Sequence, residues 1–216
     1  MPSLTRALIA VPVSIAAVAL AGCSIGDDGP RTTQTRNVSH FTRIDTRGSV
    51  DLDLHVGESQ RVRVRAGEKV IDDVFTEVRD GTLEVTFDHD GFGGDDVVVE
   101  ISVPKLTAIA ASGSGDIDAD GIDADAFALR SEGSADINLR GTVGRLVLDL
   151  DGSGDADVAQ LAAREARVTA SGSGDVDLRA DQTLNVDVDG SGDVHYRGNP
   201  QLTQRVDGSG DLSHVN

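Results

Sequence analysis

The sequence of 216 residues contains no tryptophan, one tyrosine and five phenylalanines, which excludes a core built on aromatic packing. Its single cysteine excludes an internal disulfide. Nineteen Lys and Arg residues face 37 Asp and Glu residues, and the resulting formal charge of -18 excludes nucleic acid as a partner, because no basic surface could neutralise a run of phosphates. The same charge disfavours electrostatic adhesion to an anionic lipid surface. Twenty-five glycines and an interior of Val, Leu, Ile and Ala instead favour a thin core.

The sequence also lacks an apolar run long enough to span a membrane. The longest run, Ala7 to Leu20, has 14 residues, whereas a spanning helix needs about 20. Arg6 gives this run a short positive flank. These features predict a signal peptide over residues 1–22.

The signal ends in Leu20-Ala21-Gly22-Cys23, which resembles the lipobox of bacterial lipoproteins. The resemblance implies that Cys23 is acylated and becomes the first residue of the mature protein, so that lipid (palmitate among the acyl groups) anchors the chain extracytoplasmically to the membrane of the cell envelope. The alternative is an ordinary signal followed by a stray cysteine. Residues 23–37 are polar and are predicted to form a flexible tether.

A short motif recurs through the second half of the sequence. Its first glycines are 18 to 20 residues apart in six copies. The copies are Gly113-Ser114-Gly115-Asp116, Gly133-Ser134-Ala135-Asp136, Gly152-Ser153-Gly154-Asp155, Gly172-Ser173-Gly174-Asp175, Gly190-Ser191-Gly192-Asp193 and Gly208-Ser209-Gly210-Asp211. Repeats at a fixed period indicate a stacked architecture.

Apolar residues flank each copy at every second position, which is the periodicity of an extended strand with one face buried. The glycines fall on the same alternate positions as these inward residues, where they provide no side chain. The motif is therefore interpreted as a corner at which the backbone bends between two strands. The predicted fold class is all-β: residues 106–216 form a single-stranded β-solenoid similar to a right-handed parallel β-helix, with one repeat per coil. The structural corner glycines are Gly113, Gly115, Gly152, Gly154, Gly172, Gly174, Gly190, Gly192, Gly208 and Gly210. Only residues 160–166 have a composition compatible with a short helix.

Residues 38–105 have a different pattern. Four alternating segments are joined by Gly57-Glu58, Asp80-Gly81 and a loop over 88–96, which predicts β-hairpins that close one end of the solenoid. Gly48-Ser49-Val50-Asp51 is interpreted as a degenerate seventh corner.

Several motifs resemble the adhesin-head family called the GIN domain. They are Phe41-Thr42-Arg43-Ile44 with Gly48-Ser49-Val50-Asp51-Leu52, the segment 78–85, Val103-Pro104-Lys105-Leu106, and the run from Ala111 to Ile117. The resemblance covers nearly all of residues 38–216 and implies a β-helical head displayed outside the cytoplasm, often on a lipid anchor. It carries no catalytic residues over to this chain. Ala135 departs from the motif, which suggests that its corner tolerates a methyl group.

Aspartates of the motif are expected to form one outward ladder. Neighbours about 4.8 Å apart would repel by roughly 0.9 kcal/mol in water, so some interaction must offset this. One hypothesis is that the side chains accept hydrogen bonds from the N–H groups of their own corner. The other is that they bind Ca²⁺, and no other cofactor is expected. The ladder consists of Asp116, Asp136, Asp155, Asp175, Asp193 and Asp211.

An enzyme acting on polysaccharide is the less favoured alternative, because every ladder aspartate has an equivalent one coil away, whereas a catalytic pair is unique. The five histidines share no metal-ligand spacing. We therefore expect a non-catalytic adhesion, binding or structural module, held to the membrane through Cys23, with an envelope protein or a glycan as partner. The last coil, near residue 211, is expected to leave an edge at which a second copy could pair.

Overall fold

A computed structural model describes residues 29–87 and 97–215 of the chain. The predicted all-β class is confirmed: the described residues form fifteen strands in one continuous sheet, with one short 3₁₀ helix, η1 (Ile71–Asp73). The first seven strands are β1 (Arg31–Arg36), β2 (Arg43–Gly48), β3 (Asp51–Val56), β4 (Arg61–Gly67), β5 (Val74–Arg79), β6 (Thr82–Phe87) and β7 (Val98–Val103). The others are β8 (Ala108–Gly113), β9 (Ile117–Gly133), β10 (Ile137–Gly152), β11 (Ala156–Gly172), β12 (Val176–Gly190), β13 (Val194–Arg197), β14 (Gln201–Gly208) and β15 (Leu212–His214).

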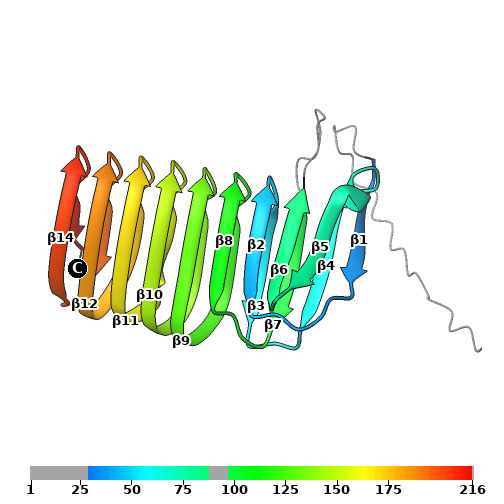
Figure 1. Ribbon diagram of the computed structural model, residues 1–216, viewed down its shortest axis with the longest axis horizontal. Helices are drawn as coiled ribbons and strands as arrows, with labels where there is room; N and C mark the ends of the chain where they lie inside the picture. The colour runs from blue at the N-terminus through cyan, green and yellow to red at the C-terminus, as the bar shows by residue number, and fades with distance from the viewer. Residues whose placement is uncertain (1–28, 88–96, 216) are drawn as a thin grey trace, which may run out of the picture.

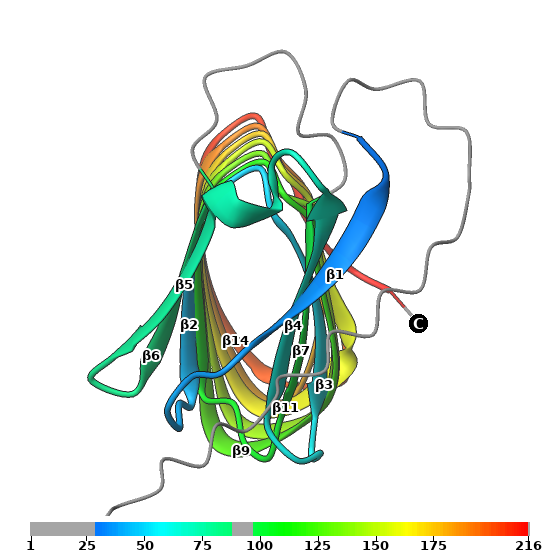
Figure 2. The same cartoon turned by 90° about the vertical axis from the view of Figure 1, so that its right-hand side faces the viewer.

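The strands wind into a flattened solenoid with two long faces (Figure 1). The β14 face consists of β5, β6, β2, β8, the second halves of β9 to β12, and β14, in that order. The β15 face consists of β1, β4, β7, β3, the first halves of β9 to β12, β13 and β15. Viewed along the axis, the coils superimpose as an elongated ring (Figure 2).

The long strands β9 to β12 each run down one face and up the other. Between their halves, glycines such as Gly121 and Gly141 adopt positive φ and let the backbone turn. Alternate side chains then point into the solenoid, as the period-two pattern predicted. The interior is filled by buried Val, Leu, Ile and Ala, with Phe41 and Phe127 among the largest buried side chains. The segment 160–166 lies within strand β11 and is not helical.

The degenerate seventh corner is confirmed by its pairing. Gly48 pairs with Gly113, and the strands on either side of Gly48 pair in parallel with those on either side of Gly113. This coil, made of β2 and β3, lies between the coil of β6 and β7 and the coil of β8 and β9. The first coil in the sequence is therefore the second along the axis.

The N-terminal strands close one end of the solenoid, but only one of the predicted hairpins forms. Asp80-Gly81 joins β5 and β6, which are antiparallel neighbours. The Gly57-Glu58 prediction was wrong, because β7 lies between β3 and β4 and pairs with both. The loop 88–96 lies outside the described residues, and the strands that flank it, β6 and β7, lie on opposite faces.

Part of the predicted tether is also strand. Residues 31–36 form β1, which pairs antiparallel with β4 along its whole length. The Arg36 guanidinium donates hydrogen bonds to the carbonyl oxygens of Ile71 (2.9 Å) and Val74 (3.3 Å) at the closed end. Three threonines, which are β-branched, support the strand although it contains no apolar residue. Within the described ranges no helix is long and apolar enough to cross a membrane.

Candidate interaction surface

The corners require glycine because successive coils touch there. The first glycine of each copy pairs with the first glycine of the next, and Gly172 has a φ of +126°. A Cβ on Gly172 would overlap the carbonyl oxygen of Gly152 one coil earlier. A Cβ on the third residue, as in Gly174, would overlap the carbonyl oxygen of Gly154 in the same way. Ala135 occupies that third position in its own copy and is buried.

The six predicted aspartates lie on one line beside the corners, joined by Asp51 of the seventh corner. Each side chain except that of Asp211 accepts a hydrogen bond from the backbone N–H of the aspartate in the next coil. The distances from N to Oδ1 are 2.9 Å for Asp116 to Asp51, 3.2 Å for Asp136 to Asp116, 3.0 Å for Asp155 to Asp136, and 2.8 Å for Asp175 to Asp155, Asp193 to Asp175 and Asp211 to Asp193. We call these seven residues the aspartate ladder.

This pattern differs from the expected capping within one corner. Only at the last coil does a ladder side chain bind its own corner, where Asp211 Oδ1 accepts from the N–H of Leu212 at 2.9 Å. Elsewhere the acceptor and donor belong to successive coils, so the bond joins coils together. A hydrogen bond to a charged acceptor contributes about 1.5–3 kcal/mol. That exceeds the repulsion of roughly 0.9 kcal/mol between neighbouring carboxylates in water.

One oxygen of each ladder carboxylate is thus occupied by a backbone donor. Within residues 29–87 and 97–215, no group of three or more His, Cys, Asp or Glu side chains is arranged to hold a metal ion. Ca²⁺ binding by the ladder stays a prediction. Cys23, the predicted anchor, lies outside the described residues.

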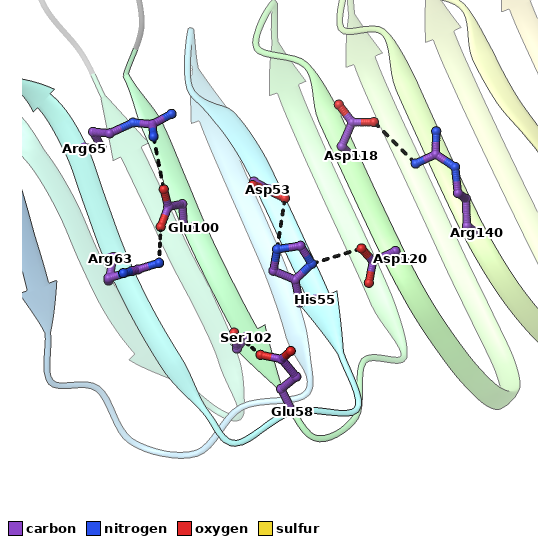
Figure 3. A network of polar contacts seen from close by, with 10 residues as sticks. All are labelled: Asp53, His55, Glu58, Arg63, Arg65, Glu100, Ser102, Asp118, Asp120 and Arg140. Atoms are coloured by element: carbon purple, nitrogen blue, oxygen red, sulfur yellow. Dashed lines mark hydrogen bonds and ion pairs between the residues drawn. The ribbon is translucent and has the colours of Figure 1, made fainter.

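A second polar cluster lies next to the ladder on the β15 face (Figure 3). Glu100 on β7 forms ion pairs with Arg63 at 2.5 Å and Arg65 at 3.3 Å, both on β4. His55 on β3 lies 3.0 Å from Asp120 on β9 and 3.6 Å from Asp53 on its own strand. The Glu100 pairs therefore join β7 to β4, and the His55 pairs join β3 to β9.

The surroundings of His55 change the ionisation of its imidazole. Its hydrogen bond with Asp120 raises the pKa of the imidazole above 6.5, and the charges of Asp120, Asp53 and Glu58 act in the same direction. Partial burial opposes the shift without reversing it. No sequence pattern singles out this residue, because His55 and Asp120 are 65 positions apart and belong to no shared motif.

Open hollows lie on the outer surfaces, and two of them lie on the long faces. One, of about 400 Å³, lies over β3 and β9 on the β15 face and is lined by aspartates of both strands together with Arg140. The other, of about 370 Å³, lies on the β14 face; Ala108, Ala110 and Ala128 are among its lining residues, as are Arg43 and Arg130. We call the second one the alanine hollow. The alanine side chains on adjacent strands are short, and the outward side chains around them are longer. This difference in length forms the hollow.

Neither hollow was predicted. The sequence pattern predicted strands beside each corner, but it did not show which outward residues are adjacent on the outer surface. Ala108 and Ala128 are direct partners between β8 and β9. A single sequence could reveal this only after the strands had been aligned coil by coil.

Residues 40–200 match the protein family described as "Putative auto-transporter adhesin, head GIN domain". The chain belongs to the GIN domain family. The match spans both the N-terminal strands and most of the repeats, in agreement with the resemblance carried by the sequence motifs. No curated protein matches the chain significantly.

Several solved structures are similar to this GIN domain. A "putative adhesin" from Bacteroides fragilis is 20% identical with a TM-score of 0.68, and the alignment covers 86% of this chain and 97% of that one. A "putative adhesin" from Parabacteroides distasonis is 21% identical with a TM-score of 0.58 over 88% of this chain and 98% of that one. A "putative lipid binding protein" from the same species is 22% identical with a TM-score of 0.56 over the same shares of the two chains. At these identities the likeness establishes the fold alone.

Proposed function

We propose that this GIN domain protein is an extracytoplasmic lipoprotein whose solenoid is a non-catalytic adhesion head. The observation that carries the proposal is the pair of long faces on which exposed polar side chains recur in every coil. Such faces favour an extended contact with a partner over enclosure of a small substrate. The adhesin description of the family agrees with this use of the surface.

The chemistry of the repeated residues also favours binding over catalysis. A catalytic carboxylate usually has a unique environment that shifts its pKa. Each ladder aspartate instead makes the same hydrogen bond as its neighbours and faces solvent from an equivalent corner. These residues are better explained as links between coils.

The lipid anchor gives the head an orientation. Seven residues separate Cys23 from the start of β1, and a fully extended segment of that length reaches about 25 Å. Since β1 lies at the closed end of the solenoid, acylation of Cys23 would hold that end near the membrane (Figure 1). The coils that end at β14 and β15 would then point away from it.

Replacing Cys23 by serine tests the anchor. In cells fed a radiolabelled fatty acid, the wild-type chain should carry the label and sediment with membranes. The Cys23→Ser chain should do neither, and because residues 29–215 are untouched it should keep the thermal midpoint of the head. Label on the serine chain, or a wild-type chain that is unlabelled and soluble, would contradict the proposed anchoring.

Adhesion is tested with cells that display the full chain. They should bind an immobilised panel of polysaccharides and purified envelope proteins more strongly than cells without the chain. Ala128→Arg fills the alanine hollow, whereas Thr169→Arg adds the same side chain to an outward position of β11 on the same face. If Ala128→Arg loses binding and Thr169→Arg keeps it, the contact lies at the alanine hollow. If the wild-type chain binds nothing on the panel, the adhesion proposal is wrong.

A further inference from the structure

The two ends of the solenoid differ in how their interior is covered, although β1 and β5 at one end and β14 at the other each leave one edge unpaired among the described residues. At one end, the antiparallel strands β1, β4 and β5 complete the faces, and Arg36 donates to backbone carbonyls of the closing segment. At the other end, β14 pairs with β12 along one side, and no strand among the described residues pairs with its other side. An unpaired edge presents a row of N–H and C=O groups to any strand that approaches.

The β14 edge carries few of the features that usually block such pairing. Its register with β12 runs without a bulge from Gln201 to Gly208. The strand contains neither proline nor lysine, and its only charged residues are Arg205 and Asp207, which pair with each other at 2.6 Å. In a chain with a formal charge of -18, this strand is locally neutral.

Side chains that face the interior are exposed at this end. Leu202 is 38% exposed, whereas Leu184, its partner one coil earlier, is 1% exposed. Val206 and Leu212 are only partly buried against the core. Apolar surface of this kind gains stability when it is covered, by roughly 25 cal/mol for each Å² removed from water.

We propose that a second copy of this chain covers this end, with the two β14 strands paired antiparallel about a two-fold axis at Gln204. Antiparallel pairing in this register keeps inward residues opposite inward residues. It places Leu202 opposite Val206 of the second copy, and the two Gln204 side chains opposite each other, where their amides can exchange hydrogen bonds. The interior of one solenoid then continues into the interior of the other.

The outward side chains are compatible with the same register. Thr203 lies opposite Arg205 of the second copy, and Gln201 lies opposite Asp207 of the second copy. No like charges are directly opposed across the pair. A two-fold contact of this kind also closes after two copies.

Stacking of β14 on the closed end of another copy is less favourable. The inward residues of the edge strand β5 are already buried or partly buried there, and its exposed Phe75 points outward from the β14 face. That end therefore offers no exposed interior to match Leu202 and Val206. Such a contact would also repeat without closing and give a fibre.

Engineered cysteines test the register. In the full chain carrying Cys23→Ser, which has no other thiol, Gln204→Cys places two cysteines opposite each other at about 4.5–5.5 Å between Cα atoms, within disulfide reach. Leu202→Cys in the same background separates the two cysteines by about 14 Å along the strands. Copper-catalysed air oxidation should give a disulfide dimer for the first variant and almost none for the second. Equal crosslinking of both, or crosslinking of Leu202→Cys alone, would overturn the register.

Light scattering of the Cys23→Ser chain tests the association itself. We expect a dimer, which Gln204→Lys should convert to a folded monomer, because two ammonium groups would oppose each other at the axis. Asn185→Lys adds the same charge on the exposed side of β12, one strand from the edge, and should leave the dimer intact. A monomeric parent chain, an open-ended polymer, or a dimer that survives Gln204→Lys would each overturn the proposal.

Discussion

Two glycines of this chain allow the free-energy cost of backbone strain to be measured separately from the cost of steric overlap. Gly172 has positive φ and lies against the backbone of the preceding coil, whereas Gly57 has a φ of +101° but no atom within 4 Å of the position that a Cβ would occupy. Alanine at Gly57 should cost about 1 kcal/mol, from strain alone. Alanine at Gly172 should cost about 3 kcal/mol or more, since the coils must also move apart.

Urea unfolding of the two alanine variants measures this difference. Equal losses of unfolding free energy would mean that contact between coils adds nothing to the requirement for glycine. Ala135→Gly is a useful third variant, because among the six copies from Gly113 to Asp211 only Ala135 has a methyl group in the third position.

Asp155 illustrates what the ladder contributes to stability. Asp155→Asn keeps an oxygen acceptor for the N–H of Asp175 and removes one charge, so it should change the unfolding free energy by less than about 0.5 kcal/mol. Asp155→Ala removes the acceptor and should cost about 1–2 kcal/mol. Thermal melts with calcium and with a chelator complete the test. A calcium-dependent rise in the wild-type midpoint that disappears in Asp155→Asn would contradict a purely structural role.

His55 should make the stability of the head depend on pH. Because the folded pKa lies above the unfolded one, the stabilisation is complete below about pH 6.5 and is lost as pH rises through the folded value. The His55→Gln variant should therefore be destabilised more at about pH 5.5 than at about pH 8.5. The difference should stay below about 1 kcal/mol, since the His55 and Asp120 side chains are 44% and 55% exposed. Urea unfolding of both proteins at the two pH values measures it, and a larger loss at high pH would contradict the sign.

Among the elements, the repeating coils could be predicted and the N-terminal strands only in part. Each coil from β9 onward pairs with its neighbour 18 to 20 residues along the chain. Its inward positions and its corners can therefore be recognised from a short stretch of sequence. The N-terminal strands find partners much further away, as in Leu52 with Ile117. Turn residues such as Gly57 mark a change of direction without specifying which strand lies alongside.

Strand β1 shows that a polar segment need not be a flexible one. Its order depends on β4 and on the Arg36 guanidinium, neither of which the local sequence reveals. Arg36→Ala should lower the unfolding free energy by about 1.5–3 kcal/mol, since it removes charged donors from two carbonyl groups. Arg47→Ala, which removes an exposed ion pair with Asp45, should cost less than about 1 kcal/mol.

Hydrogen exchange locates the effect of Arg36. In the wild type, every second amide of residues 32–36 should be protected by its hydrogen bond to β4, and Arg36→Ala should expose these amides before those of any coil of the solenoid. Unprotected amides in the wild type would restore the tether interpretation for this segment.

At the scale of the whole molecule, the two ends of the solenoid differ in how their interior is covered. The closed end carries the antiparallel strands β1, β4 and β5, whereas Leu202 of β14 is 38% exposed at the other end. If each chain is anchored at its closed end and pairs with a second copy at the other end, the dimer is one continuous solenoid. The two anchors then lie at its opposite ends, each at its own membrane or surface. A dimer of this shape would be suited to bridging.

The position of β2 and β3 has a consequence for the timing of assembly. A chain that emerges N-terminus first produces residues 43–56 early, but their partners on β6, β7, β8 and β9 appear later, the last of them 65 residues along. Each of these strands keeps one edge unpaired until its later partner on β8 or β9 has emerged, at about residue 120. After that point, each coil can add to a finished one as soon as its own 18 to 20 residues are available. The head thus has a slow start followed by stepwise growth, and a chaperone or export factor would matter most during the first phase.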